Sequence, residues 1–186
     1  VCSSAIINQQ RFRDIRTLVL SGERGEESAA RAKYKIFEPD RADLRNGKCF
    51  IRHVDRFRPI RDWKEQQVWD IIKRYRIRVH PCYYMGWGRC SCKFCIFGNK
   101  NQFASAASIS PEQISRIIKL ERDFGYTLKR NLSLPELIAM GCVYKNITPE
   151  LQCLATSYNY DQAIILSVTE EWTLPSGAFG ENCGAA

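Results

Sequence analysis

Apolar residues recur at two different spacings along the chain, and together these spacings predict an α/β fold. Residues 15–20 form a short, nearly continuous apolar and β-branched run that Ser21 and Gly22 end, which predicts a buried strand and a turn. Residues 25–35 are rich in strong helix formers, with acidic side chains in the first turn, so we expect a helix there. A strand, a glycine turn and a helix in this order commonly bind anions in α/β proteins.

The rest of the chain predicts mainly helices. Asp62 and Glu65 resemble a capping box before an amphipathic segment, and Ser110-Pro111 and Gly125 mark the two ends of another. The expected helices cover residues 63–75, 111–125, 134–140 and 149–158. Residues 50–54 and 163–168 are the other strand candidates, and a further helical turn is the alternative at 163–168. Residues 80–99 are predicted to be a loop rich in glycine, cysteine and aromatic side chains.

Length and charge narrow the class of protein. The 186 residues suffice for one domain with a core, and no apolar run approaches the ~20 residues of a membrane span. The N-terminus has no basic segment followed by an apolar one, so we expect a cytoplasmic protein with no membrane partner. The net charge of +8 favours anionic partners such as nucleotides, nucleic acids or sulfated small molecules.

Four of the nine cysteines fall in one loop: Cys82, Cys90, Cys92 and Cys95. A Cys-x-x-Cys pair can direct two sulfurs at one metal, and four cysteines could complete a site for zinc or an iron–sulfur cluster. A redox dithiol and a set of inert thiols remain alternatives.

The turn after the first predicted strand carries Arg24 and Arg31, whose forked guanidinium donors suit phosphate or sulfate. A helix laced with Glu/Arg pairs would have the same composition, so the composition alone leaves both interpretations open.

Four ordered motifs within residues 21–97 resemble the adenylyl-sulfate and phosphoadenylyl-sulfate (PAPS) reductase family. The substrate motif Gly-x-Arg-x-x-x-Ser-x-x-Arg-Ala is matched by Gly22, Arg24, Ser28, Arg31 and Ala32. The other three are PIRDW at residues 59–63, HPCYYMGW at residues 80–87 and SCKFC at residues 91–95.

The resemblance implies the C-terminal part of an adenine nucleotide alpha-hydrolase-like parallel sheet with flanking helices, followed by a mostly helical tail. It places a PAPS reductase-like domain with the cysteine loop at residues 1–100 and a helical extension packed on it at residues 101–186. The implied ligand is ATP, adenylyl sulfate or PAPS, used for sulfur reduction or for sulfur or adenylyl transfer. Arg24, Glu27, Ser28 and Arg31 would bind it.

Cluster-bearing relatives hold a [4Fe–4S] cluster near the nucleotide sulfate, which makes Cys82, Cys90, Cys92 and Cys95 the candidate ligands, with Cys2 as a further one. Some relatives activate sulfur for modifying DNA or tRNA, and the helix and glycine-rich tail beyond residue 98 resemble phage- and mobile-element-borne members. Cys183, in Glu-Asn-Cys-Gly, stands where reductases carry a nucleophile, although a flexible terminal thiol is an alternative.

The nucleotide loop Ser-Gly-Gly-x-Asp-Ser of the family is missing from the sequence. We therefore expect an N-terminal segment or another chain to complete the sheet, whose edge would otherwise be exposed. A non-catalytic, basic nucleic-acid-binding module stapled by a metal is the alternative function, because aromatic side chains such as Tyr83, Tyr84 and Trp87 could stack on bases.

Overall fold

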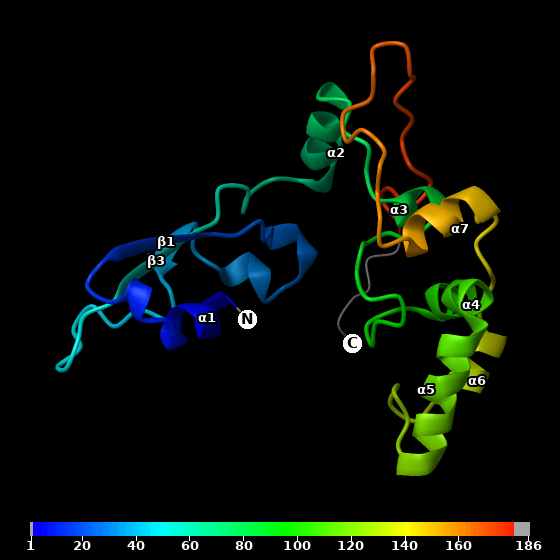
Figure 1. The fold of residues 1–186 in the computed structure, drawn as a ribbon, viewed down its shortest axis with the longest axis horizontal. Coiled ribbons are helices and arrows are strands. Elements are labelled where there is room, and N and C mark those ends of the chain that lie inside the picture. The colour runs from blue at the N-terminus through cyan, green and yellow to red at the C-terminus, as the bar shows by residue number, and fades with distance from the viewer. Residues whose placement is uncertain (1, 181–186) are drawn as a thin grey trace. The chain divides into compact units, whose positions relative to one another are not determined.

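The computed structural model describes residues 2–180, apart from the side chain of Cys2, and these residues divide into two compact units (Figure 1). Unit 1 ends at Val68 and unit 2 begins at Trp69. Cys183 lies outside the described residues. None of the helices in the part of the chain that is described has the length and apolar character needed to cross a membrane.

Unit 1 is built on a small mixed sheet. Its strands are β1 (Arg16–Leu20), β2 (Phe37–Pro39) and β3 (His53–Phe57), in the order β1-β3-β2. β1 and β3 run parallel, with Arg16 opposite His53 and Leu20 opposite Phe57, whereas β2 runs antiparallel to β3. The parallel pair confirms the predicted α/β class. The helix α1 (Cys2–Asn8) and the 3₁₀ turns η1 (Gln10–Phe12), η2 (Gly25–Glu27) and η3 (Arg31–Lys33) complete the elements described in this unit.

Among the described residues of unit 1, one face of β1 is covered. Val19 packs against a core of Ile6, Ala42 and Val54, while Leu18 and Leu20 on the other face are 55% and 66% exposed. β1 is also an edge strand, since β3 is its sheet neighbour among the described residues. The predicted strand is therefore present, but its second face and outer edge are not covered by the described part of unit 1.

The strands of unit 1 differ from the prediction in two ways. The strand expected at residues 50–54 begins at His53 and ends at Phe57. The strand β2 was not predicted; it contains Pro39, which is tolerated there because β2 is an edge strand.

The single helix predicted for residues 25–35 is wrong. The segment forms η2 and η3, separated by Ser28 in an extended conformation. Contacts with a distant segment hold it in this shape: the Gly25 amide donates to the Arg61 carbonyl at 2.8 Å, and the Arg61 guanidinium donates to the Tyr34 carbonyl at 3.0 Å. Tertiary hydrogen bonds have overridden helix propensity here.

Unit 2 is helical. The helix α2 (Glu65–Arg74) spans the boundary between the units, and α3 (Pro81–Met85), α4 (Lys100–Ile109), α5 (Pro111–Phe124), α6 (Leu134–Ala139) and α7 (Pro149–Thr156) follow. The helix α4 packs on α5 and α6, and α3 packs on α7 (Figure 1). The helices predicted from capping signals are confirmed as α2, α5, α6 and α7, with ends shifted by a few residues. The strand expected at residues 163–168 is wrong, because only an isolated bridge joins Ile165 to Ile77.

The core of unit 2 surrounds α4. One cluster joins Met85, Trp87, Ala106 and Ile109, and a second joins Phe103, Ile114, Leu134 and Leu137. Because both clusters use α4, this helix is buried on several sides and has no amphipathic stripe, so the sequence pattern did not predict it. The chain near its C-terminus packs on α3, where the Gly177 amide donates to the Tyr83 carbonyl at 2.8 Å.

Candidate functional site

A turn rich in arginine and glutamate follows the C-terminal end of β1. We call residues 21–33 the arginine turn. In α/β sheets, ligands bind outside the carboxyl ends of parallel strands, and this segment leaves the sheet at such an end. The arginine turn therefore has the position of a ligand-binding segment.

Glu27 brings the two predicted binding arginines together. Its Oε1 lies 3.5 Å from Arg24 Nε, and its Oε2 forms a very close ion pair with Arg31 Nη1. The Arg24 side chain is 13% exposed and that of Arg31 is 44% exposed. Ser28 Oγ accepts a hydrogen bond from the Arg31 amide at 3.2 Å. The four residues predicted to bind a nucleotide thus form one connected group.

A carboxylate of the arginine turn lies at the N-terminus of α2. Glu26 Oε2 accepts from the Glu65 amide at 2.7 Å and from Arg24 Nη1 at 3.0 Å, and Glu26 Oε1 lies 3.8 Å from Lys64 Nζ. The hydrogen bond from the Glu65 amide holds the pKa of Glu26 below its ordinary value. Helix N-termini favour negative charge, so these donors present an anion-binding set that Glu26 now occupies.

Beside these donors is an open cleft of about 270 Å³, lined by Gly25, Glu26, Ala32 and residues 61–64. Glu26, Arg61 and Lys64 were not among the predicted binding residues, although Arg61 lies in the PIRDW motif. The hydrogen bonds that join Arg61 to Tyr34 and Glu26 to Glu65 span 27 and 39 positions, which motif spacing does not encode.

Arg58 stabilises the start of the arginine turn, and the sequence did not predict this role. Its buried guanidinium donates to Glu23 at 2.6 Å, to Glu38 at 2.7 Å and to the Lys35 carbonyl at 2.8 Å. It also lies over the Tyr34 ring, 4.6 Å from the centroid. These contacts connect the start of the arginine turn to β2 and to the two residues, Tyr34 and Lys35, that lie shortly before β2.

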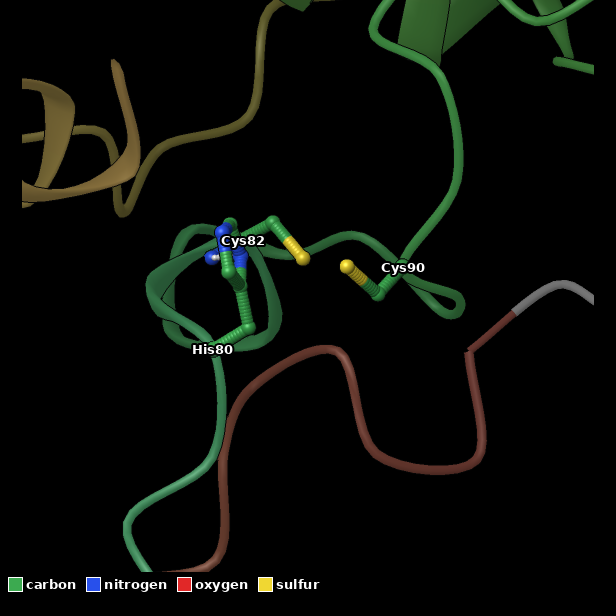
Figure 2. Close-up of side chains that lie close together, drawn as sticks. All are labelled: His80, Cys82 and Cys90. Carbon is green, nitrogen blue, oxygen red and sulfur yellow. Dashed lines mark hydrogen bonds between the residues drawn. The ribbon is translucent and has the colours of Figure 1, made fainter. Parts of the chain in front are cut away.

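The cysteine loop of unit 2 places three potential metal ligands close together, two of which are among the predicted cysteines. One ligand atom each of His80, Cys82 and Cys90 lie within 4.8 Å of one another, and Figure 2 shows the two sulfurs pointing toward each other. Cys92 and Cys95 are free thiols outside this group, the first exposed and the second half-buried. Within residues 2–180, the loop therefore brings together two of the four predicted cysteines, with a histidine that the sequence analysis did not single out.

Local structure places the members of this group. His80 is the N-cap of α3, with Nδ1 accepting from the Cys82 amide at 3.2 Å. Cys90 returns to Cys82 because its amide donates to the Tyr83 hydroxyl at 3.2 Å. Burial, together with the neighbouring Cys90 thiol, raises the pKa of Cys82, and burial lowers the pKa of His80. A neutral imidazole and closely spaced thiols are a donor set that suits zinc.

Comparison with known proteins gives one matching family model, described as the phosphoadenosine phosphosulfate reductase domain, over residues 8–142. An uncharacterized 37.8 kDa protein of Escherichia phage 186 is 35% identical over 105 residues, which cover 56% of this chain and 29% of the phage protein. The adenosine 5'-phosphosulfate reductase of Burkholderia cepacia is 29% identical over 76 residues, 41% of this chain and 27% of the reductase. The chain thus spans under a third of the length of these relatives. No solved structure matches.

Proposed function

Because the chain belongs to the phosphoadenosine phosphosulfate reductase domain family, we propose that it binds an adenine nucleotide of the adenylyl sulfate type. The observation that carries the proposal is the ion pairing of Arg24 and Arg31 with the same carboxylate, that of Glu27. One charged group that holds two guanidinium groups keeps their donors close together, as binding of a sulfate or phosphate requires.

Four residues of the arginine turn have a role in this proposal. Arg24 and Arg31 donate charge-assisted hydrogen bonds to the anionic end of the ligand. Ser28 donates its hydroxyl proton, which remains available because its oxygen accepts from the Arg31 amide. Glu26 occupies the donors of Arg24 and the α2 N-terminus, and an incoming anion competes with it for them.

The chemistry of the whole protein is part of the same proposal. We infer sulfur reduction, or transfer of sulfur or of an adenylyl group, with Cys183 as the candidate nucleophile and DNA or tRNA as candidate sulfur acceptors. A [4Fe–4S] cluster would take four ligands, and the described part of the loop gathers only Cys82 and Cys90 of the predicted set. We also propose that residues 1–100 form the reductase-like domain and that residues 101–186 form a helical extension packed on it.

Isothermal titration of the full chain with adenylyl sulfate, AMP and adenosine tests the binding proposal. We expect affinity to fall in that order, because each step removes anionic contacts worth about 1.5–3 kcal/mol per charged hydrogen bond. Equal affinity for adenosine and adenylyl sulfate would contradict the role of the arginines. Binding of a single-stranded oligonucleotide without binding of any mononucleotide would favour the nucleic-acid-binding alternative.

A further inference from the structure

We propose that His80, Cys82 and Cys90 form a mononuclear zinc site and that Cys92 and Cys95 lie outside it. The three candidate ligand atoms lie within 4.8 Å of one another (Figure 2). Zinc bonds of about 2.3 Å to sulfur and 2.0–2.1 Å to nitrogen place tetrahedral ligand atoms about 3.5–3.8 Å apart. Side-chain movements on the order of 1 Å would therefore close the site.

The backbone of the loop brings the three donors together. His80 and Cys82 are two residues apart at the start of α3, and the helix ends at Gly86, whose φ of 116° reverses the chain. The Trp87 amide donates to the Cys82 carbonyl at 3.0 Å, and Tyr83 holds the Cys90 amide. This short helical turn directs Cys90 back toward Cys82, whereas Cys92 and Cys95 lie farther along the chain, outside the ligand group.

The histidine would couple the metal to the start of α3. Its Nδ1 lone pair accepts from the Cys82 amide, so the proton of the neutral ring is on Nε2. Coordination through Nδ1 would use this lone pair, and coordination through Nε2 would require the proton to move to Nδ1. Either mode gives up the N-cap hydrogen bond, so zinc loading should alter the first turn of α3.

A pocket next to the three residues has room for an exogenous fourth ligand. Its volume is about 210 Å³, and His80, Cys82 and Cys90 line it together with Arg89 and Lys93. Lys93 Nζ is hydrogen-bonded to Ser110 Oγ at 2.6 Å, which holds this cation at the pocket. Zinc with three protein ligands commonly keeps a position for water or substrate, and the nearby positive charges favour a water-derived hydroxide or a small anion.

Metal content and cobalt spectroscopy of the full chain test this site independently of nucleotide binding. We compare the wild type with His80→Asn, which keeps an N-cap side chain, with Cys90→Ser at an exposed position, and with the matched control Cys92→Ala/Cys95→Ala. Circular dichroism checks that each variant folds. We expect one zinc per wild-type chain and thiolate-to-cobalt charge-transfer bands after substitution with Co²⁺.

His80→Asn and Cys90→Ser should each lower zinc affinity at least tenfold, and the double alanine variant should keep both the zinc and the cobalt spectrum. Iron and sulfide bound in place of zinc, and lost in the Cys92→Ala/Cys95→Ala variant, would overturn the proposal in favour of a cluster on the Cys-x-x-Cys pair. A fully reduced, folded wild type that binds no zinc would overturn it as well.

Discussion

At the residue scale, Glu26 and Glu27 are neighbours with opposite proposed effects on the ligand. Glu27 holds Arg24 and Arg31 together, whereas Glu26 occupies donors that the ligand would use. Glu27→Gln should weaken adenylyl sulfate binding by up to about fivefold, because an exposed ion pair contributes about 0.2–1 kcal/mol. Glu26→Gln should strengthen binding. Titration calorimetry of both variants measures these effects, and changes in the same direction would contradict the assigned roles.

Asp40 is the most deeply buried carboxylate with ion-pair partners described in unit 1. Burial alone would raise its pKa, but the Ala42 amide at 2.8 Å and Arg56 Nε at 2.7 Å outweigh this effect and hold the pKa below its ordinary value. A lowered pKa stabilises the fold above the unfolded-state value, and this stability is lost as pH falls through the folded-state pKa.

We therefore predict that Asp40→Asn costs about 2 kcal/mol of unfolding free energy at pH 7, and that this cost shrinks only as the pH falls below the ordinary aspartate range and through the lowered folded-state pKa. Urea unfolding over a series of pH values from 7 downward measures the cost. Asp123→Asn, on the exposed side of α5, is the matched control and should change stability little throughout the series. A cost for Asp40→Asn that stays the same down to the most acidic pH at which the protein still folds would show that the ionised carboxylate is not what stabilises unit 1.

At the scale of elements, two glycines that end helices differ in their surroundings. Gly86 ends α3 with a φ of 116°, and a Cβ there would lie 3.0 Å from Tyr144 Cγ. Gly125 ends α5 with a φ of 68°, and a Cβ at this position would meet nothing within 4 Å.

Gly86→Ala should therefore destabilise the protein by about 2–4 kcal/mol, from backbone strain plus steric overlap, and Gly125→Ala by about 1 kcal/mol, from backbone strain alone. Thermal unfolding of the two variants compares these costs. Because Gly86 also returns the chain toward Cys90, its alanine variant should lose zinc affinity, while Gly125→Ala should retain it. Equal costs at the two positions would contradict the packing described for Gly86.

The sheet of unit 1 has an apolar face and an outer edge at β1 that the described part of the unit leaves exposed. We propose that an additional strand, from an N-terminal segment or another chain, pairs with this edge, because exposed apolar edges promote association. Leu18→Lys/Leu20→Lys should leave the circular dichroism spectrum unchanged and reduce self-association of the chain in light scattering. A strictly monomeric wild type, unaffected by the two substitutions, would contradict association of this chain through β1.

The elements that the sequence predicted well have local signals. The helix α5 follows Ser110-Pro111, ends at Gly125 and carries an apolar stripe, so its pattern and its caps agree. The helix α4 is buried around much of its circumference and lacks such a stripe, and the arginine turn takes its shape from hydrogen bonds to Arg61. Both depend on tertiary contacts that periodicity does not encode.

The candidate site follows the same rule: residues with local signals were predicted, and residues defined by tertiary contacts were not. The substrate motif identified Arg24, Ser28 and Arg31, and the Glu27 carboxylate that pairs with both arginines lies three and four positions from them in the chain. Arg58 could not be distinguished from the other arginines, because the contacts that define it reach Glu23 and Glu38, 35 and 20 positions away.

At the scale of the whole molecule, the two units carry separate chemistry. Unit 1 holds the arginine turn and unit 2 holds the cysteine loop, and each has its own hydrophobic core. A substitution in one site should therefore leave the fold of the other unit unchanged. The net charge of +8 should assist the approach of an anionic ligand and make its association sensitive to salt.

Adenylyl sulfate affinity of the full chain with Arg24→Ala, at fixed ionic strength, tests the central claim most directly. Arg116→Ala, at an exposed position on α5, is the matched control, and Arg24→Lys keeps the charge without the forked donor. We predict that Arg24→Ala weakens binding by about 1.5–3 kcal/mol, roughly 10- to 150-fold, with Arg24→Lys intermediate and Arg116→Ala unchanged. Wild-type affinity in a correctly folded Arg24→Ala variant would contradict the claim that the arginine turn binds the anion.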